Sequence, residues 1–302
     1  MNSALDNLGA LRAWAATARP VFICGQERSG TSALLLALSR HPALFGVPDV
    51  YETFIFRYAR DLLGESPRKM QQGYLRGPER LATLREALVK LGDGDAGTLE
   101  DDDLVRAFFA YAAEAVYDGR RPLEKTPSHV HFLPRLFGVF PQAQVLACVR
   151  EPTEVVDSYR RRLQREQAAG KPPEAWSWLE QDNKQMIKQF RRIDRALREA
   201  AGQFPGRVFQ VPYAWLTADP PTALHAICDF LGEPFDTAML APKKVARERG
   251  DARLGEPISA SKEKSPSLLS KEEDTLFRHE VWGLTRRWRV PGIIQPEPPA
   301  AA

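Results

Sequence analysis

The chain has 302 residues, of which 43% are hydrophobic, so it can bury a sizeable core as one large α/β domain or two small ones. Its 42 basic and 39 acidic residues give a formal net charge of +3. This near balance excludes a chain dominated by one sign of charge but indicates little about partners, for which only local clusters of charge are informative. The sequence contains no polybasic tail. The three cysteines lie far apart, without the paired spacings of a zinc or redox motif, and are predicted to be buried.

The N-terminal segment lacks the basic start and continuous apolar run of a secretion signal. No segment reaches the roughly 18 apolar residues of a membrane span, so we expect a cytoplasmic protein. Residues 1–19 instead predict an amphipathic helix, because Leu5, Leu8, Leu11 and Trp14 recur at every third position.

Four short β-like runs lie at 21–25, 122–126, 145–150 and 207–211, with helical stretches between them. The first and third are apolar without alternation, which is typical of strands buried on both faces of a parallel sheet. Spacers of helix length favour right-handed crossovers. The sequence therefore predicts an α/β fold with an open parallel sheet flanked by helices.

Long, charged and helix-favouring segments at 50–120 and 160–203 interrupt the series of strands. We interpret them as helical insertions within a single domain spanning residues 1–302. The proline-containing end, 291–302, predicts a flexible tail. Residues 259–267 predict a solvated loop, with contact of Lys262 or Lys264 to a phosphate group as the alternative.

A glycine-bearing turn, GQERSGTS, connects the first strand to the apolar helical segment 33–38. Backbone N–H groups and the positive end of the helix dipole converge at such a turn, which predicts a site for a phosphate or sulfate group. The expected anion-binding residues are Gln26, Glu27, Arg28, Ser29, Gly30, Thr31 and Ser32.

This turn differs from the ATP-binding loop of the Walker type. Thr31 stands where the Walker pattern has its lysine, and Arg28 lies inside the loop instead. The third strand ends on Arg150 and not on an acidic residue that helps to hold magnesium. These differences favour an anion handled without a metal, and we predict no metal ligands.

A second cluster of anion-binding side chains follows the third strand. Arg150 lies at the strand end, and Ser158 and Arg162 share one face of the helix expected next. Arginine binds phosphate bidentately, so the three residues predict a clamp for a phosphate monoester. The remaining basic residues of this helix, which we interpret as a solvated face, are Arg160, Arg161 and Arg165.

The run GQERSGTSALLLALSRHP, the run LEKTPSHVHFLPRLFGVFPQAQVLACVREP and the spacing from Arg150 to Ser158 and Arg162 resemble the sulfotransferase family. The likeness is closest to the tyrosylprotein and carbohydrate branch, where arginine precedes S-G-T. Within it, the chain resembles a bacterial-like cytoplasmic member. It implies a P-loop-NTPase-like fold. It also implies transfer of a sulfuryl group from 3′-phosphoadenosine 5′-phosphosulfate to a hydroxyl or amine, which leaves adenosine 3′,5′-bisphosphate.

The resemblance implies a role for each part of the chain. Residues 20–50 would hold the 5′-phosphosulfate, residues 121–170 the 3′-phosphate, and residues 51–120 would lie on the acceptor side. The implied individual roles are Arg28 beside the sulfate, Lys125 beside the bridging oxygen, Arg150 and Ser158 with Arg162 on the 3′-phosphate, and Tyr213 near the adenine.

Two residues are candidates for the general base that deprotonates the acceptor. Glu52 resembles the acidic residue of the tyrosylprotein branch, and His129 resembles a histidine near the lysine in the cytosolic branch. We favour Glu52, because a loop glutamate has few structural roles and His129 suits the first turn of a helix. Phenolic, lipid, sugar and peptide acceptors are all compatible with the sequence, and oligomeric state is not indicated.

Two alternative functions stay open. A metal-dependent P-loop kinase or NTPase for small molecules shares the fold, although the missing Walker lysine argues against it. A non-catalytic nucleotide-binding module is the other. A nucleic-acid partner is not expected, because aromatic residues hardly interleave with the basic helix and acidic residues balance its charge.

Overall fold

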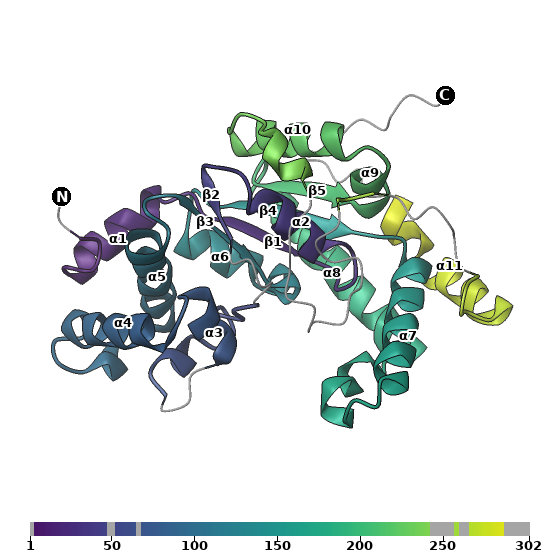
Figure 1. Cartoon of the computed structure of the whole chain (residues 1–302), viewed down its shortest axis with the longest axis horizontal. Coiled ribbons are helices and arrows are strands. Elements are labelled where there is room, and N and C mark those ends of the chain that lie inside the picture. Colours follow the sequence, from purple (N-terminus) through teal and green to yellow (C-terminus); the bar gives the residue numbers. More distant parts are fainter. Residues whose placement is uncertain (1–2, 47–51, 65–67, 242–256, 260–265, 287–302) are drawn as a thin grey trace.

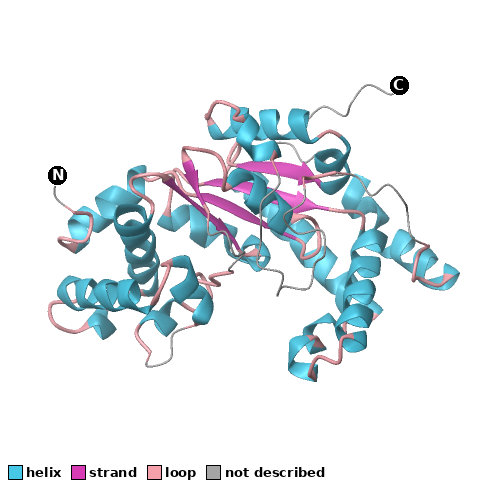
Figure 2. Ribbon diagram, viewed as in Figure 1, coloured by secondary structure: helices cyan, strands magenta, loops and turns pink. Residues whose placement is uncertain are grey.

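The computed structural model describes residues 3–46, 52–64, 68–241, 257–259 and 266–286. Lys262, Lys264 and the expected tail at 291–302 lie outside these ranges. In the described part, one sheet of five parallel strands has the order β2-β3-β1-β4-β5 (Figures 1 and 2). The strands are β1 (Val21–Gly25), β2 (Leu44–Phe45), β3 (Arg121–Lys125), β4 (Gln144–Val149) and β5 (Val208–Pro212).

Helices flank this sheet, which confirms the predicted α/β class (Figure 2). The α-helices of the described part are α1 (Leu8–Thr17), α2 (Thr31–Leu38), α3 (Lys69–Tyr74), α4 (Pro78–Leu91), α5 (Asp101–Tyr111), α6 (Leu133–Val139), α7 (Pro152–Ala168), α8 (Asn183–Gln203), α9 (Tyr213–Ala218), α10 (Pro220–Leu231) and α11 (Lys271–Arg286). Among the described helices, none combines the length and apolarity needed to cross a bilayer.

Both faces of the sheet are covered by apolar side chains, which explains the unbroken apolar sequence of β1. Phe22 and Cys24 pack with α1, α5, α6 and α8 on one face, and Val21 and Ile23 pack with α2, α9 and α10 on the other. The four strands expected from the sequence lie where predicted to within one residue. The edge strand β2 was not predicted, because a strand of two residues is too short to show a pattern.

Helices α3, α4 and α5 extend the core on the side of β3 (Figure 1). The aromatic rings of Tyr74 and Phe108 stack with centroids 5.2 Å apart, and Phe109 meets Phe22 of β1 edge-on at 5.3 Å. These rings join the segment between β2 and β3 to the sheet in one hydrophobic cluster.

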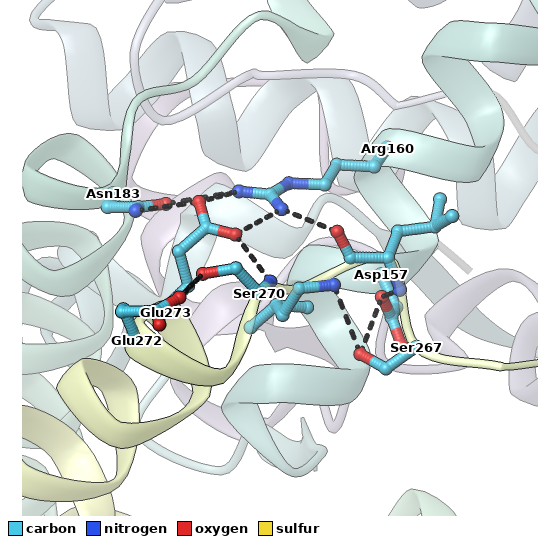
Figure 3. A network of polar contacts seen from close by, with 9 residues as sticks. Asp157, Arg160, Asn183, Ser267, Ser270, Glu272 and Glu273 are labelled. Atoms are coloured by element: carbon cyan, nitrogen blue, oxygen red, sulfur yellow. Dashed lines mark hydrogen bonds and ion pairs between the residues drawn. The ribbon is translucent and has the colours of Figure 1, made fainter.

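The C-terminal helix α11 lies against α7 and α8, where polar contacts hold its beginning (Figure 3). The two terminal guanidinium nitrogens of Arg160 donate to Glu273, at 2.6 and 2.8 Å, and the Asn183 amide donates to the same carboxylate. The Leu268 N–H donates to Asp157 at 2.7 Å. The interpretation of Arg160 as part of a solvated face is therefore wrong, because its guanidinium pairs with the Glu273 carboxylate, 113 residues away in sequence.

We predict that Glu273→Ala loosens α11 without disturbing the sheet. The pair is partly exposed, with side-chain exposures of 30% and 26%, so its loss should cost about 1 kcal/mol, or about fivefold faster local opening. Amide hydrogen exchange in α11 measures this. Glu272→Ala removes the neighbouring carboxylate, which accepts from Ser270, and should change exchange less than twofold; equal effects would contradict the role of the Arg160 contact.

Candidate active site

Parallel strands bring four candidate segments to one edge of the sheet. The loop after β1, Lys125 at the end of β3, Arg150 after β4 and Tyr213 after β5 all follow the carboxyl ends of neighbouring strands. This edge is where open α/β sheets bind ligands.

The backbone of the loop between β1 and α2 is tightly constrained. Gly25 has φ 123°, and a β-carbon on it would lie 2.2 Å from the carbonyl oxygen of Cys148. Gly30 has φ 90°, and a β-carbon there would lie 2.7 Å from the Tyr213 ring. Only glycine fits these two positions. Because they are glycines, the loop passes close to β4 at Gly25 and close to the Tyr213 ring at Gly30, just before α2 begins.

Two polar side chains inside the loop are buried, and neither has a hydrogen-bond partner in the part of the chain that the structure describes. The side-chain amide of Gln26 and the hydroxyl of Ser29 make no hydrogen bond within the described residues, and the two residues are 4% and 0% exposed. Burying such groups unpaired is costly. Together with the helix terminus that follows, they fit the oxygen atoms of an anionic ligand.

Hydrogen bonds connect this loop to the residues after β4. Arg28, with φ 66°, donates from Nε to the Ser158 hydroxyl at 3.1 Å. Arg150 donates to the carbonyl oxygen of Arg28 at 3.2 Å, and its guanidinium carbon lies 4.1 Å from the centre of the Tyr213 ring. The structure thus brings four of the predicted residues together.

Arg162 lies one turn beyond Ser158 on α7 and forms an ion pair with Glu166. Lys171 contacts the same carboxylate. Arg162 is largely buried, with 15% of its side chain exposed, and its charge is balanced by Glu166.

Lys125 and Glu52 form an ion pair at the end of β3. The Lys125 side chain is 2% exposed and that of Glu52 is 28% exposed, so the carboxylate lies on the open side of the pair. His129 is not part of this pair. Its ring is buried against Phe22 and Phe56, with Nδ1 3.0 Å from Oε2 of Glu124.

A sequence model described as the sulfotransferase family matches residues 20–237. The chain belongs to the sulfotransferase family. No curated protein sequence matches it significantly.

Solved sulfotransferase structures share the fold. The sulfotransferase domain of the Synechococcus PCC 7002 olefin synthase is 22% identical, with a TM-score of 0.52, over 87% of this chain and 95% of that one. The domain from the curacin biosynthetic pathway is 17% identical, with a TM-score of 0.55, over 87% and 97%. The sulfotransferase from Alicyclobacillus acidocaldarius is 19% identical, with a TM-score of 0.50, over 90% and 96%.

A buried carboxylate fixes the position of Glu52 in this sulfotransferase. Oε1 of Glu124 accepts hydrogen bonds from the backbone N–H and hydroxyl of Thr53, at 3.2 and 2.8 Å, and from the Thr126 hydroxyl at 2.6 Å. Burial alone would raise the pKa of Glu124, but the adjacent His129 ring and these hydrogen bonds hold it below its usual range. Glu124 therefore ties the residue after Glu52 to the residue after Lys125.

Thr53 and Thr126 were missed by the sequence analysis, although each lies directly beside a predicted site residue. Their partner Glu124 is 71 positions from Thr53, and no sequence pattern connects the two. The available signal in the sequence was that a threonine directly follows both Glu52 and Lys125.

Besides Glu52, the candidate site of this sulfotransferase has a carboxyl group on Glu27, in the loop after β1. Its side chain is half-buried, and Oε2 accepts a hydrogen bond from the Gln189 amide of α8 at 2.6 Å. Burial raises the pKa of Glu27 to about 7.

We predict that Glu124→Ala lowers the free energy of unfolding by about 3 kcal/mol, because it leaves His129 and two threonines buried without their acceptor. Glu124→Gln keeps an acceptor oxygen and should cost less. Urea unfolding measures both variants. The exposed Glu86→Ala of α4 serves as the control, with a change of about 0.5 kcal/mol or less; a Glu124→Ala variant as stable as this control would contradict the prediction.

Proposed function

We propose that this sulfotransferase moves a sulfuryl group from 3′-phosphoadenosine 5′-phosphosulfate to a hydroxyl or amine of a small-molecule or peptide acceptor. The observation that carries the proposal is the contact between two anion-binding clusters. Arg28 of the loop bonds to Ser158, and Arg150 bonds back to Arg28. A ligand with two separated anionic groups suits such an arrangement.

Each cluster has a proposed share of the donor. The loop from Gln26 to Ser32 holds the 5′-phosphosulfate through its backbone N–H groups and buried side chains. Arg150 and Ser158 hold the 3′-phosphate, with Arg162 reaching the same group from the next turn of α7. Tyr213, which packs on Gly30 and Arg150, lies beside the adenine.

The proposed reaction is a direct transfer. The acceptor oxygen or nitrogen forms a bond to sulfur and gives its proton to a general base, while the bond between sulfur and the bridging oxygen breaks. The bonding electrons stay on that oxygen, which becomes part of adenosine 3′,5′-bisphosphate. Lys125 stabilises the charge that grows on the bridging oxygen, and Arg28 stabilises the sulfuryl oxygens.

Glu52 is the proposed base. Its carboxylate is partly exposed beside Lys125, whereas His129 is buried against Glu124 and aromatic rings. A base must reach the acceptor proton, either directly or through one water. We propose that His129 acts on the site only through Glu124, which positions Glu52.

The proposal is tested by incubating the protein with sulfur-labelled donor and a metabolite extract and finding the labelled product by mass spectrometry. A thermal-shift assay tests donor recognition separately. Adenosine 3′,5′-bisphosphate should raise the melting temperature without magnesium, and ATP with magnesium should not. Stabilisation by ATP with magnesium alone would favour a kinase or NTPase instead.

We predict that Glu52→Gln lowers the transfer rate at least about 100-fold, the usual contribution of a general base. Binding of adenosine 3′,5′-bisphosphate should not weaken, because the amide keeps the size of the side chain and removes a negative charge beside Lys125. His129→Asn is the comparison and should retain most of the rate once its lower stability is allowed for. Wild-type turnover in Glu52→Gln together with its loss in His129→Asn would reverse the assignment of the base.

We predict that Arg150→Ala weakens binding of adenosine 3′,5′-bisphosphate by about 1.5 to 3 kcal/mol, the usual value of a hydrogen bond to a charged group. Titration calorimetry measures the change. Arg165→Ala removes an exposed arginine of α7 and provides the control. Unchanged affinity in Arg150→Ala would contradict the proposed 3′-phosphate site.

A further inference from the structure

Glu27 is the only acidic residue in the loop that runs from Gly25 to Ser32. A carboxylate in a loop that receives an anion is unfavourable, because like charges at short range repel strongly in a partly buried site. Its presence there requires either that Glu27 points away from the ligand or that it loses its charge when the ligand binds.

The surroundings of Glu27 connect it to the reacting groups. The titratable groups that interact electrostatically with it are Glu52, Lys125 at the end of β3 and Tyr159 of α7, and its hydrogen-bond donor is Gln189 of α8. Arg28 is its neighbour in the loop. The Glu52 carboxylate already neutralises Lys125. A second carboxylate therefore adds net negative charge where the donor arrives.

Burial and the charge of Glu52 already disfavour the ionised form of Glu27, while a backbone hydrogen bond, Lys125 and Gln189 favour it. The resulting pKa of about 7 means that protonation costs little near neutral pH. An arriving phosphosulfate raises this pKa further, because it adds negative charge.

We propose that Glu27 is a donor-binding residue in its neutral form: it takes up one proton from solvent as the donor binds and, held by Gln189, serves as a hydrogen-bonding carboxylic acid within the loop. This inference rests on the proposed function, since it concerns the same anion site.

The direction of the pH dependence follows from linkage. In the free protein Glu27 is ionised above about pH 7, so binding of the donor then requires proton uptake. Affinity for the donor or its nucleotide product therefore falls as the pH rises above 7. The limit for a single proton is about tenfold per pH unit.

The test is titration calorimetry with adenosine 3′,5′-bisphosphate between about pH 7 and pH 9, in buffers that differ in ionisation enthalpy. Over this range the charge of the nucleotide is nearly constant, because its phosphate titrates near about pH 6. Wild-type protein should lose affinity by several-fold to about tenfold per pH unit and take up close to one proton on binding at high pH.

Glu27→Gln imitates the neutral form and should bind the nucleotide with an affinity that changes less than about threefold over the same range. Gln189→Leu removes a hydrogen bond that favours the ionised form, so it should keep the pH dependence but move it to higher pH. Glu174→Gln, at an exposed glutamate of the turn before α8, makes the same change in net charge and should behave as wild type.

Wild-type binding that is independent of pH, or a Glu27→Gln variant with the wild-type pH profile, would overturn the inference and leave the proposed function intact. Absence of nucleotide binding at every pH would overturn both.

Discussion

The buried carboxylate of Glu124 determines how Glu52 and Lys125 meet at the edge of the sheet that carries the candidate site. Lys125 follows it on β3, and Glu52 precedes the threonine that bonds to it. Two segments that are distant in sequence therefore meet with opposite charges facing each other. A carboxylate buried in this way persists only because several donors surround it. The same group thus contributes to stability and to the alignment of the proposed base.

The second constraint is the close passage of the loop after β1 across neighbouring strands. Gly25 lies against β4 and Gly30 against the Tyr213 ring. With the backbone this close, Arg28 and Arg150 reach each other and Ser158. The two polar clusters form one continuous edge, in which the buried side-chain amide of Gln26 has no hydrogen-bond partner among the described residues. This is the arrangement expected of a preorganised site, where the ligand completes the hydrogen bonding.

Most of the fold could be predicted from the sequence, because the patterns that indicate strands and turns are local. Buried strands such as β1 and β4 show as apolar runs, and the glycine turn after β1 shows as a spacing. Interactions between distant segments were not visible. In the sequence Arg160 resembles any solvated arginine, because its partner Glu273 lies on α11. The hydrogen bond between Thr53 and Glu124 depends on how the chain after α2 returns to β3. Side-chain partners follow from tertiary structure, which a single sequence encodes only indirectly.

Helix α7 carries neighbouring residues with different partners: Ser158 faces the loop, while Asp157 and Arg160 hold the segment that leads into α11. Arg160 is therefore synthesised more than 100 residues before its partner Glu273. A ribosome-bound chain that ends before Glu273 contains all five strands but leaves this side of α7 without its partner. This side of α7 is therefore completed late in synthesis, whereas the contact of Ser158 with Arg28 depends only on earlier residues.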